Sequence, residues 1–118
     1  LWLSHSLPAD RLADKFETAI MDRPLKNTDL MRPGPVYTLT WGRQHSQTLL
    51  NRMAKLFDVD IFILGHQPQL QGWSKAGDNL IILASDHNQG CLLSIEDLSK
   101  SYTIDELAEA IVPMAYIA

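Results

Sequence analysis

The chain has 118 residues, 46% of them hydrophobic and 20% charged, which is the composition of one soluble globular domain or part of one. A formal net charge of -4 with scattered basic residues argues against nucleic acid as a partner, because phosphate contacts need clustered Lys and Arg. The single cysteine, Cys91, excludes an internal disulfide. With no signal peptide and no apolar run of membrane-spanning length, the sequence predicts a cytoplasmic protein without a membrane partner.

The first half of the chain is predicted to contain two strands and two helices. An apolar run predicts a strand at 1–4. A proline and an acidic residue at 8–10 then predict the start of a helix, which extends to about residue 21. The proline-rich stretch 24–35 is interpreted as a loop, which is either a lid or slack chain. Strand-forming residues predict a second strand at 36–41, and an N-capped amphipathic helix is predicted at 46–57.

The second half is organised around the stretch 60–68. Its continuous apolar run predicts a strand buried on both faces, followed by a turn through Gly, His and Pro. Polar residues at 69–79 predict a loop, and 80–95 is predicted to be a hairpin of two apolar strands with a long polar tip. A Thr-x-x-Glu capping box begins a short helix predicted to span 103–112.

Three of the predicted apolar strands end in candidate metal ligands. The first ends at His5, the second at Gly65-His66 and the third at Asp86-His87. Imidazole is the commonest protein ligand of transition metals, and carboxylate is its frequent partner. If these strands lie side by side, their ligands converge at one edge of the sheet, which is the edge where open α/β sheets bind ligands.

Several of these motifs resemble those of the calcineurin-like metallophosphoesterases, of the serine/threonine phosphoprotein phosphatase type. Ile63-Leu64-Gly65-His66-Gln67-Pro68 is similar to the Gly-His-Thr-Pro motif of that family, with Gln67 in place of Thr. Leu3-Ser4-His5 resembles the strand-then-His element that precedes it, and Thr40-Trp41-Gly42-Arg43 resembles the Trp-x-Arg between the two. The order and spacing of these motifs extend the resemblance over residues 1–98.

The resemblance implies a fold, a reaction and a cofactor. The fold would be α/β, part of a two-sheet β-sandwich flanked by helices. The reaction would be hydrolysis of phosphate monoesters, on phosphoserine or phosphothreonine proteins or on small molecules, by a hydroxide bound to two divalent metal ions. Manganese, iron or zinc are the metals that the family commonly uses. Such metals make hydroxide available near neutral pH.

The resemblance also implies a role for particular residues. His5 and His66 match the two late histidines, which bind one of the two metals. Arg43 matches an arginine that grips the phosphoryl oxygens, for which its planar fork is suited. The remaining polar residues near the motifs are candidates for the substrate side of the site: His45, Asp86 and His87.

Three motifs of the family are missing from the sequence: Gly-Asp-x-His-Gly, Gly-Asp-x-x-Asp-Arg-Gly and Gly-Asn-His-Glu. They supply the other metal ligands and the general acid, and even one catalytic zinc usually takes three protein ligands. Because the chain also starts on an apolar run without methionine, we expect 1–118 to be the C-terminal part of a single metallophosphoesterase domain, with little or no activity by itself. Two alternatives stay open: a nucleotide or dinucleoside-polyphosphate hydrolase of the same superfamily, and a non-catalytic interaction domain with structural histidines.

Overall fold

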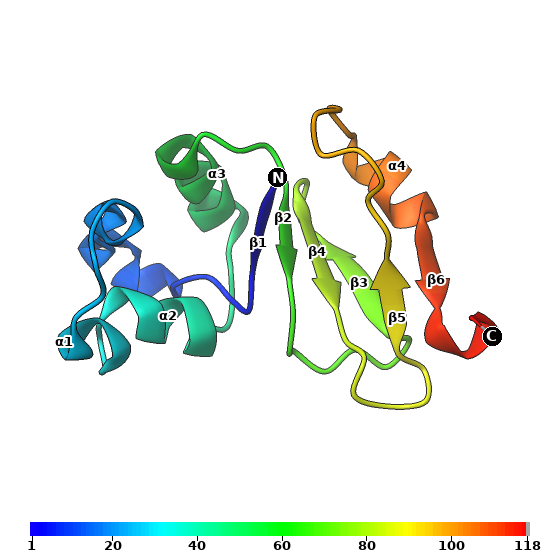
Figure 1. Ribbon diagram of the computed structural model, residues 1–118, viewed down its shortest axis with the longest axis horizontal. Helices are drawn as coiled ribbons and strands as arrows, with labels where there is room; N and C mark the ends of the chain where they lie inside the picture. The colour runs from blue at the N-terminus through cyan, green and yellow to red at the C-terminus, as the bar shows by residue number, and fades with distance from the viewer. Residues whose placement is uncertain (118) are drawn as a thin grey trace.

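The computed structural model describes residues 1–117 and is a mixed α/β structure with a four-stranded sheet and helices (Figure 1). Ala118, the last residue of the predicted 1–118 domain, lies outside the described residues. The strands are β1 (Trp2–Ser4), β2 (Phe62–Leu64), β3 (Trp73–Ala76), β4 (Leu80–Leu83), β5 (Cys91–Leu93) and β6 (Ile111–Pro113). The helices are η1 (Asp10–Lys15), η2 (Thr18–Met21), α1 (Asn27–Leu30), α2 (Pro35–Trp41), α3 (Gln47–Phe57), α4 (Ile104–Glu109) and η3 (Met114–Tyr116). Within residues 1–117, no helix has the length and apolar character needed to cross a membrane.

The main sheet has the strand order β1-β2-β4-β3. Strands β1, β2 and β4 run parallel, with Ser4 opposite Leu64 and Leu64 opposite Ile82, whereas β3 is antiparallel to β4. The predicted strands within 1–4, 60–68 and 80–84 are therefore confirmed, and they are neighbours in one sheet. Their carboxyl ends lie at the same edge.

Both faces of the central strands β2 and β4 are covered. Phe62 and Leu64 point into a core with Leu50 and Met53 of α3, while Ile63 points into a second core with residues of α4, β5 and β6. This explains why β2 is apolar at every position: alternate side chains enter different cores, and both cores exclude water. The prediction of a strand buried on both faces is confirmed.

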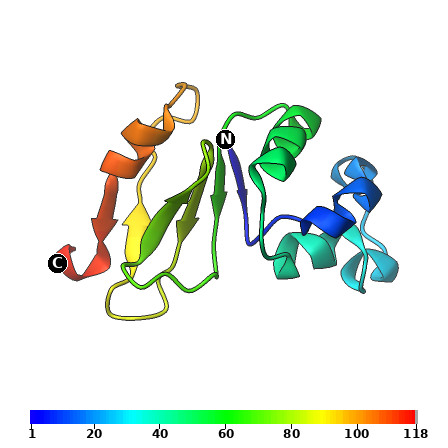
Figure 2. The same cartoon turned by 180° about the vertical axis from the view of Figure 1, so that it is seen from behind.

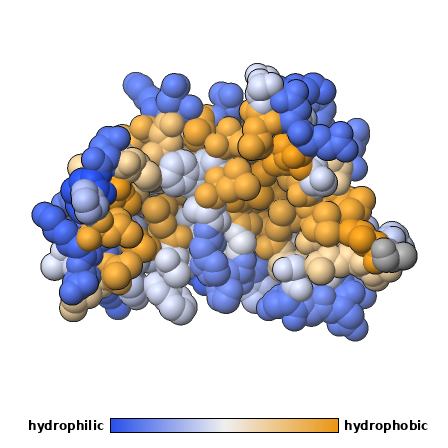
Figure 3. Space-filling model, viewed as in Figure 1, coloured by the Kyte–Doolittle hydropathy of each residue, from blue (hydrophilic) through white to orange (hydrophobic). Residues whose placement is uncertain are grey.

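Figures 1 and 2 agree in the arrangement of the elements. The four-stranded sheet lies in the middle, with α1, α2 and the two N-terminal 3-10 helices at one end and β5, β6 and α4 at the other. Figure 3 shows apolar residues across the centre of one face and at the C-terminal end, where Tyr116 is 84% exposed.

Helix α3 follows the prediction closely. It begins after Ser46, whose hydroxyl accepts a hydrogen bond from the Leu49 amide at 3.1 Å, as an N-cap residue does. It ends where Asp58 adopts a left-handed conformation, with φ of 54°. The capping box at Thr103 and Glu106 likewise begins α4.

The predicted strand at 36–41 is wrong, because this segment is the helix α2. Pro35 occupies the first turn, where its fixed φ suits a helix and its missing N–H costs nothing. The hydroxyl groups of two threonines donate hydrogen bonds to backbone carbonyls of the same helix: Thr38 to the Pro35 carbonyl and Thr40 to the Val36 carbonyl. Intrinsic strand preference is a weak constraint beside these local features.

Two further predictions, for residues 8–21 and 69–79, are wrong. The helix predicted over 8–21 is two short 3-10 helices, separated by extended backbone at Phe16 and Glu17, and Phe16 packs edge-on against Phe57 there. The loop predicted at 69–79 contains the strand β3, which turns into β4 through Gly77, with φ of 60°.

The predicted hairpin of 80–95 is also wrong. β5 does not pair with β4 along its length; it pairs antiparallel with β6 in a separate two-stranded sheet. One hydrogen bond, from the Cys91 amide to the Ala84 carbonyl, joins the two sheets at this point, and the Cys91 thiol is buried. The strand β6 replaces the end of the helix predicted over 103–112, since α4 ends at Glu109.

The stretch 24–35 is neither slack nor without structure. Asp29, which is buried, accepts two hydrogen bonds from the Arg23 guanidinium, both at 2.8 Å, and a third from the Lys26 amide at 2.7 Å. These bonds hold the pKa of Asp29 well below its usual range. We call this group of three residues the Arg23–Asp29 clasp. Asp29 belongs to the short helix α1, so the clasp ties the first turn of this helix to Arg23.

Candidate active site

The parallel strands bring two of the predicted ligands together. β1 ends at Ser4 and β2 at Leu64, and these residues are opposite each other in the sheet, so the residues that follow emerge side by side. The centroids of the His5 and His66 rings are 4.3 Å apart. Both residues are exposed, and their rings are therefore open to a ligand from solvent.

The turn after β2 has an unexpected conformation. His66, not Gly65, has the left-handed backbone, with φ of 65°, which is uncommon for a residue with a side chain. A Cβ added to Gly65 would have no atom within 4 Å. The turn thus places the strain on the residue that carries the imidazole, as often happens at functional sites.

A third predicted residue, Arg43, is held beside this pair by the segment that follows α2. The amide of Ser6 donates to the Leu39 carbonyl at 2.6 Å, and the buried Ser6 hydroxyl donates to the Gly42 carbonyl. Gly42 lies so close to the chain that a Cβ there would be 1.6 Å from the Leu7 carbonyl oxygen. The residues next to His5 and those next to Arg43 are therefore fixed to one another.

The surroundings of His5 favour its neutral form. Neighbouring atoms keep some water from the ring, and this partial desolvation lowers its pKa most; the nearby His66 and the positive charge of Arg43 lower the pKa further. A neutral imidazole presents a lone pair, which is the form that binds a metal ion. The same three residues thus favour the chemical state that a metal site needs.

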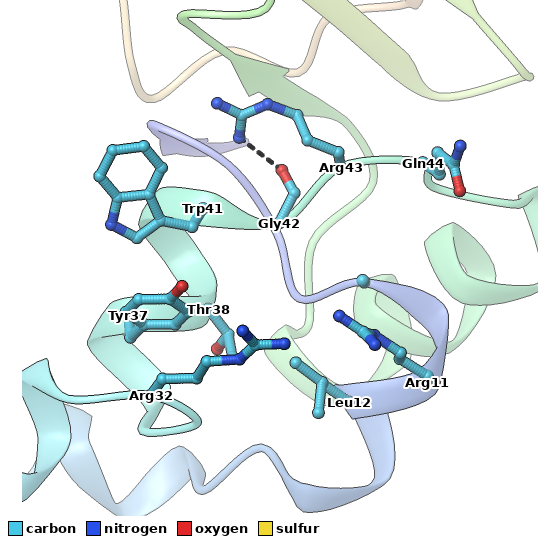
Figure 4. A pocket seen from close by; sticks show the side chains of 10 residues that line it. Arg11, Leu12, Arg32, Tyr37, Thr38, Trp41, Gly42, Arg43 and Gln44 are labelled. Atoms are coloured by element: carbon cyan, nitrogen blue, oxygen red, sulfur yellow. Dashed lines mark hydrogen bonds between the residues drawn. The ribbon is translucent and has the colours of Figure 1, made fainter.

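The Arg43 guanidinium folds back onto its own segment. One terminal nitrogen, Nη1, donates to the carbonyl of Gly42 at 2.7 Å and to that of Thr40 at 3.3 Å, next to the end of α2 (Figure 4). Among the described residues, Nε and Nη2 have no hydrogen-bond partner. These two donors form one edge of the fork, which is the arrangement that binds two oxygens of a phosphoryl group.

The other candidates lie apart from the pair or are engaged elsewhere. His45 donates from Nε2 to the Leu7 carbonyl at 2.9 Å, and its burial lowers its pKa, so it strengthens the contact between the two segments. His87 uses both ring nitrogens: Nε2 donates to the Gln69 carbonyl and Nδ1 accepts from the Gln89 amide. Asp86 is exposed in the same tip, which these bonds tie to the loop before β3 rather than to His5.

The donors at the strand ends fit part of a metal site. Two imidazoles at adjacent strand ends match the nitrogen ligands that zinc, iron and manganese accept. Within residues 1–117, no group of three or more His, Cys, Asp or Glu side chains is placed to hold a metal ion. A complete catalytic site would therefore need ligands besides these two.

A cavity of about 530 Å³ adjoins Arg43, and sequence reasoning missed most of its residues (Figure 4). Arg11 and Arg32 line it together with Tyr37 and Trp41 of α2. No motif marks the two arginines, which come from distant segments. The aromatic pair has the i, i+4 spacing of one helix face, a signal that the strand prediction for 36–41 concealed.

The site is thus described by its own residues: two adjoining imidazoles, one arginine fixed beside them, and a cavity rich in arginine. Comparison with known proteins yields no relative, because no protein-family model, no curated protein and no solved structure matches this chain.

Proposed function

We propose that this chain is the C-terminal part of a calcineurin-like metallophosphoesterase that hydrolyses phosphate monoesters. The observation that carries the proposal is the contact of the His5 and His66 rings at neighbouring strand ends, with Arg43 fixed beside them. The order of the three motifs along the chain supports the same family. Phosphoserine or phosphothreonine in proteins is the proposed substrate, with small phosphate esters as the wider class.

Each residue has a defined task in this proposal. His5 and His66 hold one of two divalent ions, of manganese, iron or zinc, each through one neutral ring nitrogen. When bound, such ions supply the Lewis acidity that makes water a nucleophile near neutral pH. Arg43 orients the phosphoryl group with the Nε and Nη2 edge of its guanidinium and offsets the negative charge that develops on the oxygens.

The finer fold belongs to the same proposal. The four-stranded sheet and the β5–β6 sheet contribute to one apolar core, and helices pack on the far side of the larger sheet. This arrangement is compatible with part of a two-sheet β-sandwich flanked by helices. Because two imidazoles are too few ligands for two metal ions, we expect residues 1–118 alone to bind metal weakly and to turn over little substrate.

A non-catalytic interaction domain is the second candidate, and the hydrogen bonds of Arg43 favour it. An arginine that donates to the Thr40 and Gly42 carbonyls stabilises the end of α2 without any ligand. In that case the histidines at the strand ends are structural residues, and their replacement leaves metal binding unchanged.

Metal titration of the chain separates the two candidates. Binding of Co²⁺ would be followed by its absorption spectrum in the unaltered chain and in His66→Asn, because asparagine tolerates the left-handed backbone at 66 but lacks the imidazole. His87→Gln is the matched control, since this exposed histidine already uses both ring nitrogens. We expect weak binding that His66→Asn abolishes and His87→Gln leaves unchanged.

A hydrolysis assay then tests the reaction itself. A chain extended upstream in its reading frame should hydrolyse p-nitrophenyl phosphate with manganese, and both a chelator and His66→Asn should abolish turnover. Hydrolysis by the extended chain that survives His66→Asn with the fold intact would contradict the proposal.

A further inference from the structure

The charges around the cavity beside Arg43 are all of one sign. The chain has 14 acidic and 10 basic residues, yet three arginines and no aspartate or glutamate line this cavity. Among residues 1–117, the ion pairs of arginine involve Arg23 and Arg52 but not Arg11, Arg32 or Arg43. In an acidic protein, a cavity with this lining concentrates positive charge at one place.

Arg11 and Arg32 both line the part of the cavity away from Arg43. Figure 4 shows their guanidinium groups pointing toward one another, on the opposite side of Gly42 from the Arg43 guanidinium. Guanidinium groups that line one cavity without a carboxylate among them attract an anion that carries several oxygens. The lining thus offers two separate places for phosphate oxygens: one at Arg11 and Arg32, and one at Arg43.

One side of the cavity is aromatic. Tyr37 and Trp41 project from the same face of α2, with ring centroids 6.4 Å apart, and Figure 4 shows them on one side between Arg32 and Arg43. Trp41 is 58% exposed, so much of its ring is available to a planar group. A ring of this kind stacks on the planar rings of ligands.

The size of the cavity selects a small molecule. Its volume of about 530 Å³ lies inside the ~300–1,000 Å³ range of ligand pockets. We propose that it binds small molecules that carry an aromatic ring and more than one phosphate, with a second phosphate on Arg11 and Arg32 and the ring against Trp41. The assignment of the reacting phosphate to Arg43 rests on the proposed function, whereas the second-phosphate subsite does not.

Binding measured by calorimetry tests this subsite in the 118-residue chain, with a chelator present so that no metal contributes. The probes are adenosine diphosphate, inorganic pyrophosphate, adenosine and a short phosphoserine peptide. We expect adenosine diphosphate to bind most tightly and pyrophosphate next. Arg11→Gln and Arg32→Gln should each weaken both by about tenfold or more, because each removes a charged hydrogen-bond donor.

Two further variants complete the test. Trp41→Leu should weaken adenosine diphosphate but not pyrophosphate, and Arg52→Gln, which alters an exposed arginine paired with Asp14, is the matched control that should change neither. Circular dichroism would check that each variant is folded. Three results would overturn the proposal: no binding of adenosine diphosphate, equal weakening by Arg52→Gln, or tighter binding of the phosphoserine peptide. Each is independent of the metal titration, so either proposal can fail alone.

Discussion

At the scale of single residues, the sequence does not show which positions have a left-handed backbone or leave no room for a side chain. The Gly-His pair after β2 suggests that Gly65 provides the turn, but the left-handed residue is His66 and Gly65 has open space around it. Gly42 does require the absence of a side chain, and its close approach to Leu7 fixes Arg43 beside His5. The sequence does predict which side chains meet, since His5 and His66 follow strands that proved to be neighbours.

A pair of alanine substitutions measures this difference. Gly42→Ala should lower the free energy of unfolding by about 1–3 kcal/mol or more, because the new methyl overlaps a backbone carbonyl that cannot move away alone. Gly65→Ala should change it by only a few tenths of a kcal/mol, roughly the effect of an unstrained surface substitution. Urea unfolding curves of both variants would show this. Equal destabilisation would mean that the approach of Gly42 to Leu7 does not hold the two segments.

The site should also make stability depend on pH. Partial desolvation of the ring, His66 and Arg43 lower the pKa of His5 in the folded protein, so below the unfolded value near 6.5 the unfolded chain binds more protons. The free energy of unfolding should therefore be largest above that pH and fall as the pH drops through the lowered pKa. His45, whose pKa burial also lowers, adds to the effect.

Replacement of His5 tests this assignment. His5→Gln should make the free energy of unfolding less dependent on pH between 7 and 5. Unfolding curves at several pH values provide the measurement. An unchanged slope in His5→Gln would assign the dependence to other groups.

At the scale of elements, helices and buried strands differ in how well the sequence predicts them. α3 is predictable because residues within or next to the helix determine its N-cap, its apolar face and its end. α2 is not, because valine, tyrosine and threonine favour strands, and only the proline at its start indicates a helix. The strands β3 and β6 are short and partly exposed, so their pairing depends on partners that composition does not reveal.

The Arg23–Asp29 clasp gives the segment 24–35 a testable role. Asp29→Asn keeps the shape of the side chain but removes the charge that Arg23 binds, so the segment should open more often. We expect trypsin to cleave after Lys26 faster than in the unaltered chain, as followed by mass spectrometry. Asp14→Asn, which removes the charge of the exposed partner of Arg52, is the control and should cleave at the original rate. Slow cleavage in Asp29→Asn would show that contacts of α1 hold the segment instead.

At the scale of the whole molecule, the sequence predicts the parallel half of the main sheet better than its surroundings. Apolar runs mark β2 and β4 because both of their faces are buried, and β1 pairs with β2 at the edge of the sheet although Leu3 is exposed. The second sheet could not be predicted in this way, since β5 and β6 are brought together across the intervening α4. The cavity lined by arginines was not predicted for the same reason, because its lining residues are far apart in the chain.

The junction between the two sheets contains the one thiol of the protein. Cys91 opens β5, its amide is bonded to the residue after β4, and its sulfur lies so near Gly72 that a side chain there would touch it. A reagent that modifies thiols can reach this sulfur only when the junction separates. The rate at which Cys91 reacts with such a reagent therefore measures how often the two sheets part, and no label has to be introduced elsewhere in the chain.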